Sequence, residues 1–294
     1  MKNFKNAFDW DINQTPIYDQ YGNVIKGYKE VARKGIDNSD NDGTIAVMKN
    51  TYTPISTKLF TEFVETIARN IGAEIAGYTD WGNGSTMGGT RQVITAQMQL
   101  TEALSIGGSK IEGYLTIGTG FDGQRSFYVG HTNQYLRCSN QWGSIIADMT
   151  ARLTKNVLLR VEDIIENISL YTEYEKELYK NFVKFQDVKI DERLIQECIG
   201  RVAGLTDEER LMTTKERHEL LSSQKLNKID EISASVRGEV AELGPNAWAL
   251  FNGITHYTTH IMNSRTQESF GNLFGAKQAA NQKAYDFGME LIEA

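Results

Sequence analysis

The sequence predicts an α+β fold, with an antiparallel sheet and one packed helix in the N-terminal half and long helices in the C-terminal half. Segments rich in Val, Ile, Tyr, Phe and Thr are separated by glycine-rich turns over residues 74–138. From Asn140 onward, apolar residues recur at helical spacing. Pro245 is the only proline after Pro54, which favours long uninterrupted helices.

One amphipathic helix is predicted over Ser56–Ile71. Pro54 disfavours helix just before it, and Ser56 or Thr57 can cap its start. Gly72 stands where a glycine commonly ends a helix. The apolar residues that share one face are Ile55, Leu59, Phe60, Phe63, Val64, Ile67 and Ile71. We expect this stripe to be buried against the sheet.

Strands are predicted on both sides of this helix. The candidates are Thr44–Thr53, Glu74–Trp81, Thr90–Leu100, Lys110–Thr119 and Arg125–Cys138. Residues 91–100 alternate between a mainly apolar set that includes Ile94 and a more polar set that includes Gln97, which predicts a half-buried strand with one polar face. Tyr18–Asn23 predicts a turn or short hairpin within a polar N-terminal extension.

Helix is predicted from residue 140 to the end. The first stripe at helical spacing consists of Trp142, Ile145, Ile146, Met149 and Leu153. Thr206–Glu209 predicts a capping box, and Gly244–Asn246 breaks the chain before a helical block at Ala247–Met262. The expected organisation is therefore an extension over residues 1–43, a sheet with one helix over 44–140, and a helical region over 141–294.

Composition places the chain among soluble intracellular proteins. Hydrophobic residues make up 40% and charged residues 23%, which is ordinary for a globular domain. The apolar runs are too short to span a bilayer, and the N-terminus has no signal-peptide core. Cys138 and Cys198 occur at unrelated positions, which is typical of a reducing compartment. We expect a cytoplasmic protein of a bacterial host cell, with no membrane partner.

The net charge of −7 is unevenly distributed, because residues 1–160 carry a net +1 and residues 161–294 a net −8. Within residues 123–160, the bases Arg125, Arg137, Arg152, Lys155 and Arg160 are accompanied by one acid, Asp148. The aromatic residues interleaved with them are Phe127, Tyr128, Tyr135 and Trp142. Single-strand nucleic-acid binders combine a cationic groove with aromatic stacking platforms. The alternative is that the aromatics form core and the bases are scattered over the surface.

No catalytic, metal or cofactor site can be assembled from the remaining residues. His256 and His260 have the spacing of a metal-binding pair but lack a third ligand. The glycines near residues 82–89 lack the Lys-Ser/Thr of a phosphate loop. Cys138 and His131 would lie on opposite faces of one strand. We therefore expect a protein that is not an enzyme and that holds no cofactor.

Three motifs resemble a known family. The first is Tyr52, followed shortly by the capped helix. The second is Leu115–Gly123, a strand ending in an Asp-Gly turn, with the later Leu136-Arg137-Cys138-Ser139-Asn140. The third is Ala247–Tyr257, with the trailing His260, Arg265 and Phe270-Gly271. Together these resemble the phage/plasmid-like proteins of mobile genetic elements over roughly residues 44–285. The sequence departs from that family in placing His256 where an acid is expected.

The order of elements is also similar to that of Rad-fifty-two-type single-strand annealing proteins, which form rings on single-stranded DNA. The combined resemblance implies a phage- or plasmid-encoded, non-enzymatic annealing-type protein that acts on single-stranded DNA as a homo-oligomer. The alternative is a structural or accessory protein that binds a host or virion protein through its acidic helical half.

Overall fold

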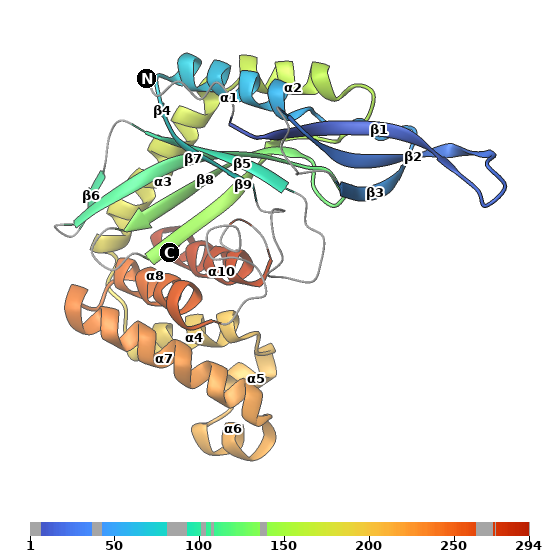
Figure 1. The fold of residues 1–294 in the computed structure, drawn as a ribbon. Coiled ribbons are helices and arrows are strands. Elements are labelled where there is room, and N and C mark those ends of the chain that lie inside the picture. Colours follow the sequence, from blue (N-terminus) through green and yellow to red (C-terminus); the bar gives the residue numbers. More distant parts are fainter. Residues whose placement is uncertain are drawn as a thin grey trace. The chain divides into compact units, whose positions relative to one another are not determined.

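The computed structural model describes residues 7–36, 43–80, 93–100, 104–106, 109–135, 140–262, 273 and 275–293 (Figure 1). The chain divides into two compact units. The first unit comprises Met1–Thr101, Tyr114–His131 and Ile145–Thr172, and the second comprises Glu102–Gly113, Thr132–Ser144 and Glu173–Ala294.

The first unit opens with a three-stranded antiparallel sheet in the order β1-β2-β3. Its strands are β1 (Trp10–Tyr18), β2 (Val24–Gly35) and β3 (Gly43–Lys49). The turn between β1 and β2 is closed by the Asp19 carboxylate, which accepts hydrogen bonds from the backbone N–H groups of Tyr21 and Asn23, both at 2.9 Å. The hairpin predicted at Tyr18–Asn23 is confirmed, but most of the polar extension around it is strand.

Helix α1 (Thr57–Ile71) confirms the most detailed sequence prediction. The Ser56 side chain accepts a hydrogen bond of 3.1 Å from the Leu59 N–H, and Gly72 ends the helix in the left-handed region at φ 68°. Phe60, Val64 and Ile67 are fully buried in one hydrophobic cluster with residues of the sheet described next. The expected packing of this helix on a sheet is therefore present.

The second sheet has six strands in the order β4-β5-β7-β8-β9, with β6 paired to β7. They are β4 (Glu74–Asp80), β5 (Val93–Gln99), β6 (Leu104–Ile106), β7 (Ser109–Gly120), β8 (Phe127–Tyr135) and β9 (Asn140–Ala151). Val93 and Thr95 are buried along with Ile94 and Ala96, so both sides of β5 are covered at these positions. The expectation of a polar, solvent-facing side is wrong for this part of the strand.

The predicted start of helix near Asn140 is also wrong, because residues 140–151 form β9. The stripe that includes Trp142 and Met149 matches helical spacing, but short apolar runs fit either period. Ile145, Ile146 and Thr150 are β-branched and favour strand. Helix begins instead at Val157, after a turn.

Helices dominate the rest of the described chain, and no strand of the described residues follows β9. They are α2 (Val157–Glu166), α3 (Ser169–Asp187), α4 (Glu192–Ala203), α5 (Asp207–Leu211), α6 (Thr214–Leu220), α7 (Ser223–Leu243), α8 (Ala247–His256), the π-helical turn η1 (Tyr257–Ile261) and α10 (Ala276–Glu293). The predicted capping box is confirmed at Thr206 and Glu209, although α5 is short. Within the described residues, none of these helices has the length and apolar character to cross a bilayer.

Candidate functional site

Tyr52 joins three segments of the first unit. Its hydroxyl donates a hydrogen bond of 3.0 Å to the carbonyl of Gly120, at the end of β7. Its backbone N–H donates to the Lys49 carbonyl at 2.9 Å, and its backbone forms an antiparallel bridge with Thr154. Burial raises the pKa of the Tyr52 hydroxyl, which keeps it protonated as a donor.

Most of the predicted phosphate-binding residues lie on the segments that Tyr52 joins. Arg152 and Lys155 are exposed in the turn that flanks Thr154, and Arg160 is exposed on α2. Arg125 is half-buried in the connection from β7 to β8. A Cβ placed on Gly120 would stand 2.8 Å from the Arg125 Cβ. Arg125 therefore lies directly beside Gly120, the residue whose carbonyl accepts the Tyr52 hydrogen bond. Arg137 lies outside the described residues.

Lys49 is a cation that the sequence reasoning missed. It is exposed at the end of β3, and its carbonyl accepts the Tyr52 N–H. Lys49 and Thr154 are separated by about a hundred residues in sequence. The Tyr52–Thr154 bridge and a hydrogen bond of 2.9 Å from the Thr53 N–H to the Leu153 carbonyl bring their segments together. We call Lys49, Arg125, Arg152, Lys155 and Arg160 the Tyr52 cluster.

The start of α2 adds to the positive potential of the cluster. Its first turn holds no acid, and the Asn156 side chain makes no capping hydrogen bond there. The N-terminus of a helix carries a partial positive charge from its unpaired N–H groups. Asp163 pairs with Arg160 at 3.4 Å, but both side chains are about 60% exposed, and such a pair is worth little in water. We therefore treat the cluster as a candidate surface for an anion.

The aromatic residues expected to stack on bases are buried. Phe127 is fully buried in the core of the first unit, and Tyr128 and Trp142 are 2% and 3% exposed. The side chain of Tyr135 lies outside the described part of the chain. A buried ring cannot stack on a nucleobase in solvent, so the expected stacking role is wrong for Phe127, Tyr128 and Trp142.

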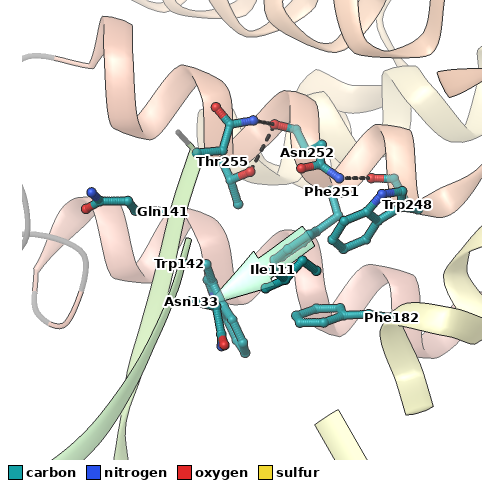
Figure 2. A pocket seen from close by; sticks show the side chains of 10 residues that line it. Ile111, Asn133, Gln141, Trp142, Phe182, Trp248, Phe251, Asn252 and Thr255 are labelled. Atoms are coloured by element: carbon teal, nitrogen blue, oxygen red, sulfur yellow. Dashed lines mark hydrogen bonds between the residues drawn. The ribbon is translucent and has the colours of Figure 1, made fainter. Parts of the chain in front are cut away.

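The second unit contains a pocket that the sequence reasoning did not predict (Figure 2). Aromatic side chains line one part, and amides and a hydroxyl line the rest: Ile111, Asn133, Asn140, Gln141, Trp142, Phe182, Trp248, Phe251, Asn252 and Thr255. The cavity volume is about 20 Å³. In this form the pocket has room for roughly one water.

Two asparagines from different motifs meet in this pocket. The Asn140 side-chain amide donates a hydrogen bond of 3.2 Å to the Asn252 carbonyl, linking β9 to α8. The Asn252 amide in turn donates to the Trp248 carbonyl at 3.0 Å. Thr255 also donates to the Asn252 carbonyl at 3.0 Å, as Figure 2 shows. These residues of the second and third motifs therefore have a structural role in holding a strand against a helix.

A buried carboxyl lies beside this pocket. Glu175 is 9% exposed, and burial raises its pKa above the ordinary value. The Tyr179 hydroxyl is 2.8 Å from the Glu175 carboxylate and 3.4 Å from the side-chain oxygen of Asn133, which lines the pocket. Gly113 is required on β7, because a Cβ there would be 2.3 Å from the Tyr179 hydroxyl oxygen. Glu175, Tyr179 and the backbone of Gly113 are therefore in close contact.

The match to known proteins covers most of the chain. Residues 44–282 match the family described as a domain of unknown function (DUF932). The chain belongs to this family. The matched region contains the Tyr52 cluster, the pocket and Glu175, and begins after β2. Neither the curated proteins nor the solved structures contain a significant match to this chain.

The other candidates within the DUF932 region give no complete site. The His256 and His260 rings are 4.9 Å apart, and His256 Nδ1 is 3.4 Å from the Ser235 hydroxyl. The described residues hold no group of three His, Cys, Asp or Glu side chains able to bind a metal ion. His131 is buried, and burial lowers its pKa to about 3. Cys138 and the glycines at 82, 84, 88 and 89 lie outside the described residues.

Proposed function

We propose that the protein binds single-stranded DNA through its first unit and catalyses no reaction. The observation that carries the proposal is the convergence on Tyr52 of the segments that bear Lys49, Arg125, Arg152 and Lys155. Cations on one surface can each contact a phosphate, whereas cations scattered over a fold cannot act on one strand. The Arg and Lys side chains would bind the phosphates of the backbone without reading its sequence.

The charge distribution supports a polyanion as the partner. The chain as a whole carries −7, whereas residues 123–160 hold five Lys/Arg against one Asp, so the excess of base there is local and not a result of overall composition. The resemblance in element order to annealing proteins favours single-stranded DNA among the polyanions. A phage or plasmid origin, a cytoplasmic location and assembly into a homo-oligomer belong to the same proposal.

A protein partner is the second candidate, and one observation in the acidic second unit favours it. Leu211 is 88% exposed and Leu220 is 67% exposed, on α5 and α6, neither of which has a buried residue. Exposed leucines on short helices can insert into a groove of another protein. This candidate predicts that the purified chain does not bind DNA.

Fluorescence anisotropy with a labelled single-stranded oligonucleotide, measured at several salt concentrations, tests the proposal. For four or five phosphate contacts, we expect the logarithm of the binding constant to fall with the logarithm of salt with a slope of about −3. An absence of binding at low salt would contradict the proposal and favour the protein partner. Light scattering at the same protein concentrations would show whether binding requires an assembly larger than a dimer.

A further inference from the structure

The β1–β2 hairpin with β3 carries an unusual concentration of exposed apolar side chains. Within the described residues, seven large apolar side chains between positions 18 and 47 are at least about 37% exposed: Tyr18, Tyr21, Val24, Ile25, Tyr28, Ile36 and Val47. Figure 1 shows the hairpin extending away from α1 and β4 of the same unit. Large exposed apolar patches on soluble proteins commonly mark binding sites. We call residues 10–35 the hairpin arm.

Three of these side chains are tyrosines at the outer part of the arm. Tyr21 lies in the turn and is 79% exposed, while Tyr18 and Tyr28 are 60% and 44% exposed. Each presents a planar ring to solvent, in contrast to the buried Phe127 and Tyr128. The arm therefore offers the aromatic surface that the core residues cannot.

The charge of the arm favours an anionic partner. Lys26 and Lys34 are exposed on β2, and Lys29 is half-buried. Asp19 accepts backbone hydrogen bonds within its own turn. The Glu30 carboxylate accepts hydrogen bonds from the hydroxyl groups of Thr15 and Thr44, and these bonds lower its pKa. Residues 10–35 hold four Lys/Arg against three Asp/Glu, so the arm carries a small net positive charge.

The arm is continuous with the Tyr52 cluster. Tyr28 on β2 is the cross-strand partner of Lys49 on β3, and partners in an antiparallel pair project on the same side. The Asn50 N–H also donates to the Gly27 carbonyl at 3.0 Å. A strand of DNA bound at Lys49 would therefore meet the Tyr28 ring next.

The inner end of the arm is fixed to the body of the first unit. Arg33 on β2 forms two hydrogen bonds of 2.8 Å with Asp80 at the end of β4. Asp80 also accepts the Trp10 ring N–H at 2.9 Å, and the Arg33 guanidinium lies 4.0 Å from the centre of the Trp10 ring. This buried group holds the arm, so its tyrosines are displayed in a defined place.

We propose that Tyr18, Tyr21 and Tyr28 form a stacking platform for the bases of single-stranded nucleic acid whose phosphates contact the Tyr52 cluster. This inference rests on the proposed function and adds base stacking as a second component of binding. Aromatic rings bind any base through its π-face and therefore give affinity without sequence preference. Duplex DNA hides these faces, so the platform selects unpaired strands.

The test compares two oligonucleotides with the same number of phosphates, one of thymidines and one of abasic sites. Wild-type protein should bind the thymidine strand at least tenfold more tightly than the abasic strand. Tyr18→Ser, Tyr21→Ser and Tyr28→Ser together should reduce that ratio to near one and leave the salt slope unchanged. Tyr21→Phe with Tyr28→Phe keeps the rings and should keep the ratio. Leu211→Ser is the control for loss of an exposed apolar side chain in the second unit.

The outcomes separate the two proposals. Wild-type protein that binds neither strand overturns both the proposed function and the platform. Wild-type protein that binds both strands equally, or serine variants that keep the full ratio, leave the charge-based function standing and overturn the platform. If a serine variant changes the molecular mass measured by light scattering but keeps the ratio of affinities for the two strands, the arm makes contacts between copies of the chain instead. Circular dichroism of each variant confirms that it is folded.

Discussion

The Tyr52 hydroxyl and the Gly120 carbonyl are joined by a buried hydrogen bond of 3.0 Å that spans 68 residues of sequence. Because Tyr52 also pairs with Thr154 through its backbone, this one residue fixes the β7–β8 connection beside the turn that carries Arg152 and Lys155. Tyr52 itself is 8% exposed and cannot contact a ligand directly. Its role is to position the cations around it.

Tyr52→Phe removes this hydrogen bond and leaves the Gly120 carbonyl without its partner. The loss of one buried hydrogen bond should lower the free energy of unfolding by about 1–3 kcal/mol, measured by urea denaturation. Tyr21→Phe, which alters an exposed hydroxyl, is the matched control and should change stability by less than about 0.5 kcal/mol. Equal effects of the two substitutions would show that the Tyr52 hydroxyl does not stabilise the fold.

The double change Arg152→Glu with Arg160→Glu should weaken binding of single-stranded DNA by an order of magnitude or more. Both side chains are exposed, so the fold should be retained. Each lost phosphate contact should also flatten the salt slope by about one unit. Anisotropy measurements at several salt concentrations give both quantities.

The matched control for this charge reversal is Lys180→Glu with Lys215→Glu, in the second unit. Lys180 is 66% exposed and Lys215 is 85% exposed, and the change in net charge is the same. The control should leave affinity nearly unchanged if binding occurs at the Tyr52 cluster. If the control loses as much affinity as the Arg152/Arg160 variant, binding responds to the overall charge of the protein. If neither double variant loses affinity, the DNA-binding site lies elsewhere.

Features encoded locally were predictable from the sequence. Helix α1 has a single apolar stripe, a serine at its start and Gly72 at its end, all within seventeen residues that need no distant contact. The turn at Tyr18–Asn23 and the capping box at Thr206 are local in the same sense. The basic run Arg152, Lys155 and Arg160 is also visible because its members are close in the chain.

Features that depend on distant contacts were not predictable. The apolar residues of 140–151 fit a helix or a strand, and β9 exists because β8 provides a neighbour for it. Whether Phe127 faces solvent depends on what covers both sides of the sheet, and Phe63 of α1 packs against its ring. The segments that carry Lys49 and Arg152 meet through the pairing of Tyr52 and Thr53 with Thr154 and Leu153. A single sequence contains no local signal for any of these contacts.

Asp80→Ala should be strongly destabilising, because it leaves Arg33 as a buried charge without its bidentate partner. Arg33 and Asp80 side chains are 7% and 14% exposed, and breaking such a pair typically costs about 3–5 kcal/mol. The double variant Arg33→Met with Asp80→Leu has neither charge, so it should be less destabilised than the Asp80→Ala variant. Urea denaturation of wild type, Arg33→Met, Asp80→Leu and the double variant measures the coupling, and additive effects would show that the pair does not interact.

Gly253→Ala should destabilise the second unit by about 1–3 kcal/mol, because α7 and α8 approach closely at this residue. A Cβ on Gly253 would stand 2.4 Å from the Val236 Cα, so the helices would have to separate. Gly238 on α7 is the control, since a Cβ there has no neighbour within 4 Å. Gly238→Ala should raise stability by about 0.5–1 kcal/mol through helix propensity. Thermal unfolding should therefore shift in opposite directions for the two substitutions.

Glu175 should make the stability of the protein depend on pH. Burial raises its pKa in the folded state above the ordinary value near 4.5, so the folded chain holds a proton that the unfolded chain has released. The stabilisation is complete below pH 4.5 and is lost as pH rises through the raised pKa.

Glu175→Gln keeps an oxygen that can accept from Tyr179 but cannot ionise. The variant should therefore gain stability relative to wild type as pH rises, by about 1.4 kcal/mol for each unit by which the folded pKa is raised. Urea denaturation from pH 4 to pH 8 measures this difference. Glu177→Gln, at a side chain that is 58% exposed on the same helix, should change the free energy of unfolding at neutral pH by less than about 0.5 kcal/mol. A constant difference between wild type and Glu175→Gln across this range would show that Glu175 is solvated in the folded protein.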